Sequence, residues 1–272
     1  MRAVVLGDGL LGLPVTRALA DGGHWIRPMS RFNLDLRDPV SEDAFAGADL
    51  VVNTMAMTDV DGCEDKADEA RRVNADAAGE VARAAAAAGA RLVHVSTDYV
   101  LQPLGVYAKT KLEGERAVLK AKKDALVVRC STTFGPHPLR RDFVRWVLGE
   151  LRTKGEATVA GDMFSCPTYS LEAARFIAEA AERAVTGTFH VANSRGVSRW
   201  ELANAAQRAF GVPGAVRRGS MKDVAWKAPR AADTRMPQDL PDWFVPLTLE
   251  ACLGDYAERE RTESAAKEGM RE

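Results

Sequence analysis

The sequence predicts an α/β protein built on a doubly wound parallel sheet. Two observations predict this fold. Short apolar stretches alternate with helical stretches through the first half of the chain, and a glycine-rich loop joins the first apolar stretch to the first helical one. Apolar strands that alternate with helices are typical of a parallel sheet covered on both faces. Right-handed crossovers place helices on both faces, so we expect a doubly wound sheet of the Rossmann type.

Each expected strand is a short run rich in apolar and β-branched residues, such as RAVVL near the N-terminus. The expected strands are residues 2–6, 24–28, 50–54, 91–95, 125–129 and 187–192. Helical spacing of apolar and polar positions predicts the helices between and after them. These are residues 10–20, 64–88 as one or two helices, 108–121, 143–151, 171–184 and 199–210. Ser198 is expected to cap the last helix, because a serine hydroxyl can accept a hydrogen bond from the first turn.

The composition is that of a globular protein. The 272 residues are 46% hydrophobic and 28% charged, which excludes a disordered chain, a collagen-like chain and a membrane protein. With 37 Lys and Arg against 38 Asp and Glu, the net charge of −1 carries no signature of nucleic-acid or membrane binding. The four cysteines lie far apart without metal-ligand spacing, so no metal site is expected. Reduced thiols and an N-terminus without a signal peptide predict a cytoplasmic protein.

The glycine-rich loop fits the pattern G-x-G-x-x-G, which is typical of dinucleotide binding when it follows a strand and opens a helix. Glycines allow a tight turn and a close approach of the diphosphate, while the helix N-terminus supplies N–H groups and a favourable dipole. The residues expected to bind the cofactor here are Gly7, Gly9, Leu10, Leu11 and Gly12. The alternative interpretation is a glycine-rich turn without a ligand.

The region after the second expected strand predicts which dinucleotide is preferred. Enzymes that use NAD usually carry an acidic residue there to bind the ribose, but residues 25–31 (WIRPMSR) contain two arginines and no acid. An arginine can pair with a 2′-phosphate, so we expect NADP(H) to be preferred, with NAD(H) as the alternative. Ser30 and Arg31 are the candidates for this contact. Alternatively, Arg31 is a solvated loop residue.

A Y-x-x-x-K pattern supplies a candidate proton donor. Tyr107 and Lys111 stand four residues apart near the start of a helix, which places both side chains on one helix face. Reduction of a ketone by hydride leaves an alkoxide that needs a proton, and a phenol can supply it. A neighbouring ammonium would lower the pKa of the phenol from its usual value near 10. The alternative interpretation, without a catalytic role, is a surface tyrosine beside a solvated lysine.

Several sequence blocks resemble one known family. The blocks are VVNTMAMTDVDGCE from residue 51, RRVNADAAGEVARAA from residue 71, VHVSTDYV from residue 93, VYAKTKLEGE from residue 106, RCSTTFG from residue 129 and, more faintly, APRAADTRMP from residue 228. In this order they resemble the extended short-chain dehydrogenases/reductases, and within them the dTDP-4-dehydrorhamnose reductase group. The resemblance covers most of the chain, and the STDYV and YAKTKLEGE blocks together are its most specific part.

The resemblance implies roles at matching positions. Thr97 would orient the substrate carbonyl, Tyr107 would be the acid, and Lys111 would hold the nicotinamide ribose. The positions that would surround the rest of the cofactor are Asp35 and Leu36 near the adenine, and Ala56 and Asn74 along the cofactor channel. The implied reaction is transfer of a hydride from NADPH to a 4-keto-6-deoxy nucleotide sugar.

The chain departs from the family pattern in four places. Only ten positions separate Thr97 from Tyr107, and the longer loop usual there helps to form the substrate pocket. Met57 replaces an aromatic residue. Residues 162–168 read DMFSCPT where D-Q-x-G-x-P-T is usual, and the phosphate loop is one residue short. These departures keep two other functions open: a non-catalytic NADP-binding regulatory protein of the same fold, and a reductase of a non-sugar ketone in secondary metabolism.

The expected organisation has three parts. Residues 1–135 form the dinucleotide-binding part, residues 136–258 form a smaller substrate-binding part that shares one body with it, and residues 259–272 form a charged, frayed tail. The candidate partners are a small-molecule substrate and a second copy of the chain in a homodimer, and the regulatory alternative described above would add a partner enzyme. His137, just beyond the fifth strand, is a candidate pocket residue. Arg140 and Arg141 are either contacts for a substrate diphosphate or a solvated basic pair.

Overall fold

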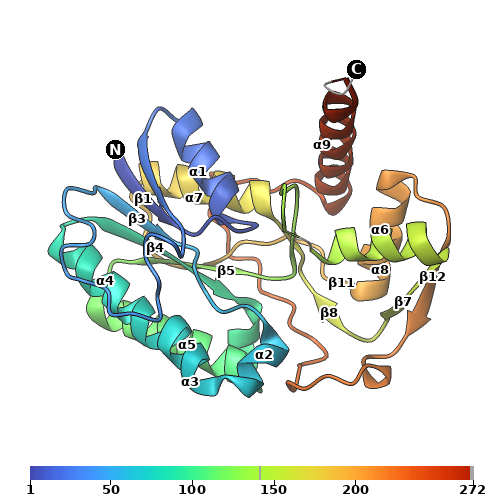
Figure 1. Cartoon of the computed structure of the whole chain (residues 1–272), viewed down its shortest axis with the longest axis horizontal. Coiled ribbons are helices and arrows are strands. Elements are labelled where there is room, and N and C mark those ends of the chain that lie inside the picture. The colour runs from blue at the N-terminus through green and yellow to red at the C-terminus, as the bar shows by residue number, and fades with distance from the viewer. Residues whose placement is uncertain (141, 270–272) are drawn as a thin grey trace.

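A parallel sheet forms the centre of the molecule (Figure 1). The computed structural model describes residues 1–140 and 142–269. In space the six strands of the sheet follow the order β10-β5-β4-β3-β1-β2, and all neighbouring pairs are parallel. Their bounds are β1 Arg2–Leu6, β2 Trp25–Met29, β3 Leu50–Asn53, β4 Arg91–Thr97, β5 Leu126–Cys130 and β10 Gly187–His190. This confirms the predicted fold, and the strand bounds differ from the predicted ones by two residues at most.

Helices cover both faces of the sheet (Figure 1). One face packs against α1 (Gly12–Asp21) and α7 (Ser170–Glu182), and the other against α4 (Ala77–Ala87) and α5 (Val106–Ala121). The strands β1 and β3 are buried on both faces, as a parallel sheet between two helical layers requires. The fold therefore hides the strands and leaves their carboxyl ends as the place for a ligand.

The stretch predicted as one or two helices over residues 64–88 is divided further. It comprises α2 (Val60–Asp65), α3 (Ala67–Arg71), a π-helical turn (Arg72–Asp76) and then α4. α2 begins earlier than predicted because the Asp59 side chain accepts a hydrogen bond from the Gly62 N–H at 3.0 Å. The π-helical turn lies against α5, where a Cβ on Gly114 would stand 2.1 Å from the Asn74 carbonyl oxygen. A glycine is therefore required for this close approach.

A second core lies beside the sheet. Its helices are α6 (Phe143–Lys154), α8 (Arg199–Phe210) and α9 (Leu249–Gly269). The short strands of this half are β6 Thr133–Phe134, β7 Glu156–Ala160, β8 Phe164–Ser165, β9 Thr168–Tyr169, β11 Val197–Ser198 and β12 Ala215–Gly219. Two 3₁₀ turns lie at Asp98–Leu101 and Met221–Asp223. Ser198 caps α8 as predicted, in a capping box with Glu201. Because α7 and β10 return to the sheet, the two halves of the sequence are interleaved in space.

Residues 259–269 are helical and do not form the frayed tail expected over residues 259–272; residues 270–272 lie outside the described residues. Helix α9 continues to Gly269 and projects from the body (Figure 1). Its first turns are buried through Leu253 and Tyr256, and Arg259 Nε donates to Asp255 at 2.8 Å. Arg145 also pairs with Glu260. These contacts and the absence of proline favour continuation of the helix.

Within residues 1–140 and 142–269, none of the helices combines the length and the apolar character needed to cross a membrane.

Candidate active site

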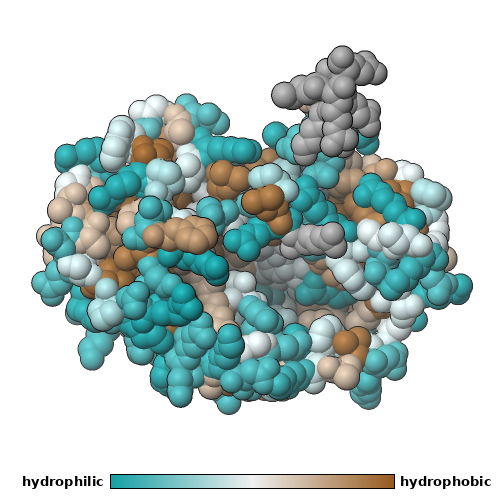
Figure 2. All heavy atoms as spheres, in the orientation of Figure 1, coloured by the Kyte–Doolittle hydropathy of each residue, from teal (hydrophilic) through white to brown (hydrophobic). Residues whose placement is uncertain are grey.

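A cavity of about 710 Å³ opens at the carboxyl ends of the sheet strands. It lies beside the end of β1, which pairs with β2 on one side and with β3 on the other. The strand order reverses at this point, and open α/β sheets bind ligands at such a switch point. Figure 2 shows this face hollowed between the part that contains the sheet and the part that contains α6 and α8. The residues predicted for the site that line the cavity are Gly7, Gly9, Leu10, Leu11, Gly12, Arg31, Asp35, Leu36, Ala56, Thr97, Tyr107 and Lys111.

The glycine-rich loop forms a cradle at one wall of this cavity. Gly7 has φ of +107°, which only glycine adopts readily. A Cβ on Gly12 would stand 2.1 Å from the Gly7 carbonyl oxygen, so the loop and α1 approach too closely for any side chain. No side chain caps the N-terminus of α1. The Leu13 N–H already donates to the Gly9 carbonyl at 3.2 Å, so the N–H groups of the loop and of Gly12 are the donors that face the cradle. This is the arrangement that holds a diphosphate.

His137 supports the loop from behind and does not line the cavity, in contrast to the pocket role considered for it. Its Nδ1 accepts the N–H groups of Leu139 at 3.1 Å and Arg140 at 2.9 Å. The ring proton must then be on Nε2, which donates to the Asp8 carbonyl oxygen at 3.0 Å. Arg140 lines the cavity, with Nη2 3.8 Å from the Asp8 carboxylate. Arg141 lies outside the described residues.

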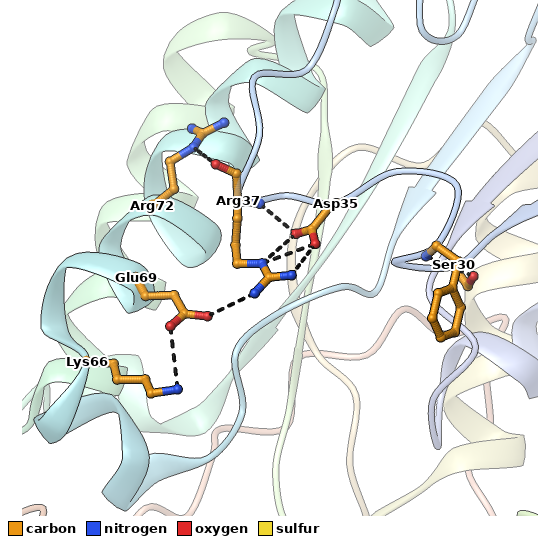
Figure 3. A network of polar contacts seen from close by, with 7 residues as sticks. Ser30, Asp35, Arg37, Lys66, Glu69 and Arg72 are labelled. Atoms are coloured by element: carbon orange, nitrogen blue, oxygen red, sulfur yellow. Dashed lines mark hydrogen bonds and ion pairs between the residues drawn. The ribbon is translucent and has the colours of Figure 1, made fainter.

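A network of charged residues forms the wall that the resemblance assigns to adenine (Figure 3). Arg37 Nε and Nη2 donate to Asp35, with distances from 2.5 to 3.1 Å, and these hydrogen bonds lower the pKa of Asp35 to about 2. Arg37 also lies 4.0 Å from Glu69, which in turn pairs with Lys66 at 3.7 Å. Arg37 and Glu69 line the cavity beside Asp35 and Leu36. Sequence reasoning missed Arg37, although it follows Asp35 by two residues.

The two residues proposed for the 2′-phosphate separate in the structure. Arg31 lines the cavity, with its guanidinium 5.5 Å from the centre of the Phe32 ring. Ser30 does not line the cavity: its hydroxyl donates to Asn33 Oδ1 at 3.2 Å and accepts the Phe32 N–H at 3.3 Å. Its loop therefore uses the serine for its own turn, and Arg31 is the side chain left for a ligand.

Asn74 also lies behind the cavity wall and not in it. Its Oδ1 accepts the Met57 N–H at 2.8 Å, and its Nδ2 donates to the Met57 carbonyl at 3.1 Å. A further contact joins Nδ2 to the Thr110 hydroxyl at 3.3 Å. The buried amide thus fixes the strand-end segment that presents Ala56 and Met57 to the cavity.

Thr97, Tyr107 and Lys111 meet on the opposite wall. Thr97 ends β4, Tyr107 lies in the first turn of α5, and Lys111 follows one turn later. All three are buried, and Lys111 Nζ donates to the Val95 carbonyl at 2.8 Å. The Tyr107 ring contacts Tyr99 edge to face, with 5.8 Å between ring centres.

The protonation of this wall differs from the sequence expectation. Burial raises the pKa of Tyr107 above its ordinary value, and the Thr97 hydroxyl offsets only part of that rise. Burial also lowers the pKa of Lys111 to about 8, although Glu115 acts in the opposite direction. Desolvation therefore outweighs the effect expected from the neighbouring ammonium. The phenol keeps its proton at neutral pH and is available as an acid.

Asp98, which the sequence analysis did not single out, organises this wall from within. Its carboxylate accepts hydrogen bonds from Thr97 Oγ1 at 3.0 Å, Ser131 Oγ at 2.7 Å and Thr234 Oγ1 at 2.5 Å. The single proton of the Thr97 hydroxyl is thereby directed to Asp98. The Thr97 oxygen accepts the Tyr99 N–H at 3.3 Å. Burial raises the pKa of Asp98, while the three hydroxyls favour its ionised form.

The segment that departs from D-Q-x-G-x-P-T is absent from the cavity lining. Asp162 accepts the Ser220 hydroxyl at 2.5 Å and the Met221 N–H at 2.7 Å. Cys166 is buried against Met236. The short connection after Thr97 forms a single 3₁₀ turn, Asp98–Leu101, before α5 begins.

The residues present fit a dinucleotide. A cradle that a Cβ would fill, an arginine at the adenosine end and a long cavity between them are the parts such a cofactor requires. Among the described residues, histidine, cysteine and carboxylate side chains do not gather in threes or more in a way that could hold a metal ion.

Comparison with known proteins gives one consistent family. The family described as the RmlD substrate binding domain matches residues 1–240. The dTDP-4-dehydrorhamnose reductase of Mycobacterium tuberculosis is 35% identical over 253 residues, which cover 85% of this chain and 83% of that protein. The spore coat polysaccharide biosynthesis protein SpsK of Bacillus subtilis is 30% identical over 241 residues, with coverage of 82% and 84%.

Solved structures show the same fold. A dTDP-4-dehydrorhamnose reductase from Clostridium acetobutylicum superposes with a TM-score of 0.90 at 24% identity, covering 96% of this chain and all of that one. The Bacillus anthracis reductase in complex with NADP has a TM-score of 0.87 at 24% identity, with coverage of 94% and 98%. These comparisons confirm the resemblance drawn from the sequence blocks. The chain belongs to the family of the RmlD substrate binding domain.

Proposed function

We propose that this protein is an NADPH-dependent reductase of a 4-keto-6-deoxy nucleotide sugar of the dTDP-4-dehydrorhamnose kind. The observation that carries the proposal is a buried, protonated Tyr107 in the same cavity as a glycine cradle for a dinucleotide. Relatives named dTDP-4-dehydrorhamnose reductase, at 33% and 35% identity, support the substrate class.

When bound in this cavity, NADPH would supply the hydride that adds to the carbonyl carbon of the substrate. The electron pair of the C=O π bond moves to oxygen, and that oxygen takes the proton of the Tyr107 hydroxyl. The product is a secondary alcohol, and the phenolate left on Tyr107 regains a proton from solvent. Lys111 holds the cofactor ribose and stabilises the transient phenolate through its positive charge.

The cofactor is held by groups that the cavity already presents. The N-terminus of α1 and Gly7–Gly12 bind the diphosphate, Arg31 binds the 2′-phosphate, and Asp35 with Leu36 borders the adenine. NADH is the weaker alternative, because residues 25–31 place no carboxylate where it would bind a 2′-hydroxyl.

Thr97 has a different role in this proposal from the one the resemblance implies. Its proton is directed to Asp98, so it is not free to donate to the carbonyl, and its hydroxyl lies beside the Tyr107 phenol. Ser96 is the neighbouring alternative donor: its hydroxyl is buried, lacks a partner among the described residues and belongs to the cavity lining.

The proposal also covers the cellular compartment and the oligomeric state. Four buried free thiols fit a reducing compartment, so we place the enzyme in the cytoplasm. The homodimer stays a prediction, which light scattering of the purified protein decides. A mass of one chain would exclude it.

The experiment is NADPH oxidation by wild-type protein and by Tyr107→Phe, with dTDP-4-dehydrorhamnose as substrate. We expect turnover by the wild type and a loss of about 10²- to 10⁴-fold in kcat for the variant. Equal turnover by both would overturn the role of Tyr107. A wild type that binds NADPH but reduces neither this sugar nor a panel of other ketones would favour the regulatory alternative. Reduction of a non-sugar ketone alone would favour the secondary-metabolic one.

A further inference from the structure

Arg199 places a guanidinium in the wall of the cavity at its substrate side. It is the first residue of α8, and its N–H donates to the Met163 carbonyl at 3.0 Å. The antiparallel pair β8–β11 and the Ser198 cap fix the start of this helix. The Arg199 side chain lines the same cavity as Thr97 and Tyr107. Two short strands thus bring an arginine from the second half of the chain to the catalytic wall.

This guanidinium has no acidic partner. Within the described residues it makes neither an ion pair nor a side-chain hydrogen bond, and it packs 4.8 Å from the centre of the Phe143 ring. Burial lowers its pKa, Tyr99 and Asp98 act in the opposite direction, and the charge of Arg230 lowers the pKa further. Arginine nevertheless keeps its charge at any physiological pH. The cavity wall therefore holds a desolvated cation that makes no direct ion pair among the described residues.

The carboxylates around it are already engaged. Asp98 accepts from three hydroxyls, as described above. Glu201, on the same helix, accepts the Ser198 N–H at 2.7 Å. Asp61 accepts Arg230 Nη1 and Nη2 at 2.9 and 3.0 Å. None of these carboxylates makes a hydrogen bond or an ion pair with Arg199 within the described residues, so its N–H groups are left for a ligand.

We propose that Arg199 binds the diphosphate of the nucleotide-sugar substrate, an inference that rests on the proposed function. A guanidinium can donate two parallel N–H groups to a phosphate, and burial strengthens that contact. The site is close to the reaction centre, because Arg199, Asp98 and Tyr107 line the same cavity, and the Tyr99 ring packs edge to face on Tyr107. The keto sugar then spans from the diphosphate on Arg199 to the acid.

Arg199 suits this role better than Arg140, which the sequence analysis considered for it. The Arg140 side chain is 60% exposed and faces Asp8 of the phosphate loop, so it belongs to the cofactor side. Arg199 lines the cavity together with Thr97 and Asp98 at the end of β4, so it belongs to the substrate side. Two separate cations, one beside each diphosphate, allow cofactor and substrate to bind together.

The test uses the full chain with dTDP, thymidine and NADP⁺ as probes in calorimetric titrations. In Arg199→Gln we expect the Kd of dTDP to rise by about 10- to 100-fold, while the Kd of NADP⁺ and that of thymidine stay unchanged. Arg199→Lys keeps the charge without the fork and should lie between wild type and Arg199→Gln. The matched control is Arg195→Gln, an exposed arginine four residues earlier, which should leave the Kd of dTDP unchanged.

An unchanged Kd of dTDP in Arg199→Gln overturns the proposal. An equal loss of NADP⁺ affinity also overturns it and assigns Arg199 to the cofactor, and an equal loss for thymidine assigns it to the packing of the site. Failure of the proposed function is a distinct result. If dTDP binds through Arg199 but the wild type reduces no keto sugar, the anion subsite stands and the reductase assignment fails. If the sugar is reduced with the same KM by wild type and Arg199→Gln, the reductase stands and the subsite fails.

Discussion

The two ends of the cavity are built in contrasting ways. At the catalytic wall, Thr97, Asp98, Tyr107 and Lys111 are each at most 8% exposed and are fixed by hydrogen bonds between strand and helix. At the adenosine end, the network of Asp35, Arg37, Glu69 and Lys66 sits on a loop and a short helix, with the Arg37 side chain 58% exposed (Figure 3). The catalytic wall is therefore desolvated and held by hydrogen bonds, while the adenosine end is charged and exposed to solvent.

This difference in burial predicts which mutations should change the catalytic rate and which should change the affinity for the cofactor. A buried group that loses its partner costs free energy that solvent does not restore. Exposed ion pairs contribute about 0 to 1 kcal/mol and weaken in salt. The catalytic wall should therefore control kcat, and the adenosine end should control cofactor choice in a salt-dependent way. Four predictions follow this contrast.

The largest of these effects is expected for Asp98→Asn. An amide cannot accept all three hydroxyls, so the Thr97 hydroxyl loses its fixed orientation and with it the position of the phenol. We expect kcat to fall by about 10- to 100-fold with NADPH affinity unchanged. The control is Asp233→Asn, an exposed carboxylate next to Thr234 that pairs with Arg235. A loss of NADPH affinity without a loss of kcat would contradict the contrast.

The pH dependence should come next in size. The lowered pKa of Lys111, about 8, means that its ammonium is present below pH 8 and lost above it. Because the charged form holds the ribose, kcat/KM should fall about tenfold per pH unit above 8. Lys111→Arg, which stays charged, should remove this limb even if its plateau is lower. The unfolded chain binds more protons between pH 8 and the ordinary lysine pKa, so stability should rise across that interval in wild type and not in Lys111→Met.

At the adenosine end, Arg31→Ala should lower the preference for NADPH over NADH by about 5- to 10-fold and leave kcat unchanged. Thermal melting with each cofactor measures the change, since a ligand that binds the folded state raises the melting temperature. The NADPH-dependent rise in wild type should shrink at high salt. The opposite result would contradict this role of Arg31. If Arg37→Ala removes the preference for NADPH and Arg31→Ala does not, the Arg37 side chain breaks its ion pair with Asp35 and binds the 2′-phosphate itself.

The smallest effect is expected for Lys66→Gln. This side chain is 63% exposed and reaches the cavity only through Glu69 and Arg37. The Kd of NADPH should change by less than about twofold. A change of tenfold or more would show that the charge network acts as one unit at this end too, and the contrast between the two ends would fail.

Patterns within one segment predicted much of this molecule. The strands, the glycine cradle and the pair Tyr107 and Lys111 all follow from local spacing. What failed depends on segments far apart in the chain. Thr234 reaches Asp98 across 136 positions, and Arg199 reaches the cavity only because β8 pairs with β11. Spacing also cannot report burial, which is why the direction of the Tyr107 pKa was wrong.

Ser30 and Asn74 were predicted to contact the cofactor, but neither lines the cavity. Both are polar residues at the predicted positions, yet the structure uses Ser30 for its own turn and Asn74 to hold Met57. A residue type and its place along a motif do not say whether its polar atoms are already satisfied. Only the hydrogen-bond partners separate a residue that touches the ligand from one that shapes the wall.

The most direct test of the central claim, that Tyr107 protonates a ketone reduced by NADPH in this cavity, is a single-turnover measurement. Wild type and Tyr107→Phe, each loaded with NADPH, are mixed with dTDP-4-dehydrorhamnose, and NADPH fluorescence is followed. We expect rapid loss of fluorescence in wild type, a rate at least about 100-fold lower in the variant, and the same Kd of NADPH for both. Equal rates in the two proteins would contradict it.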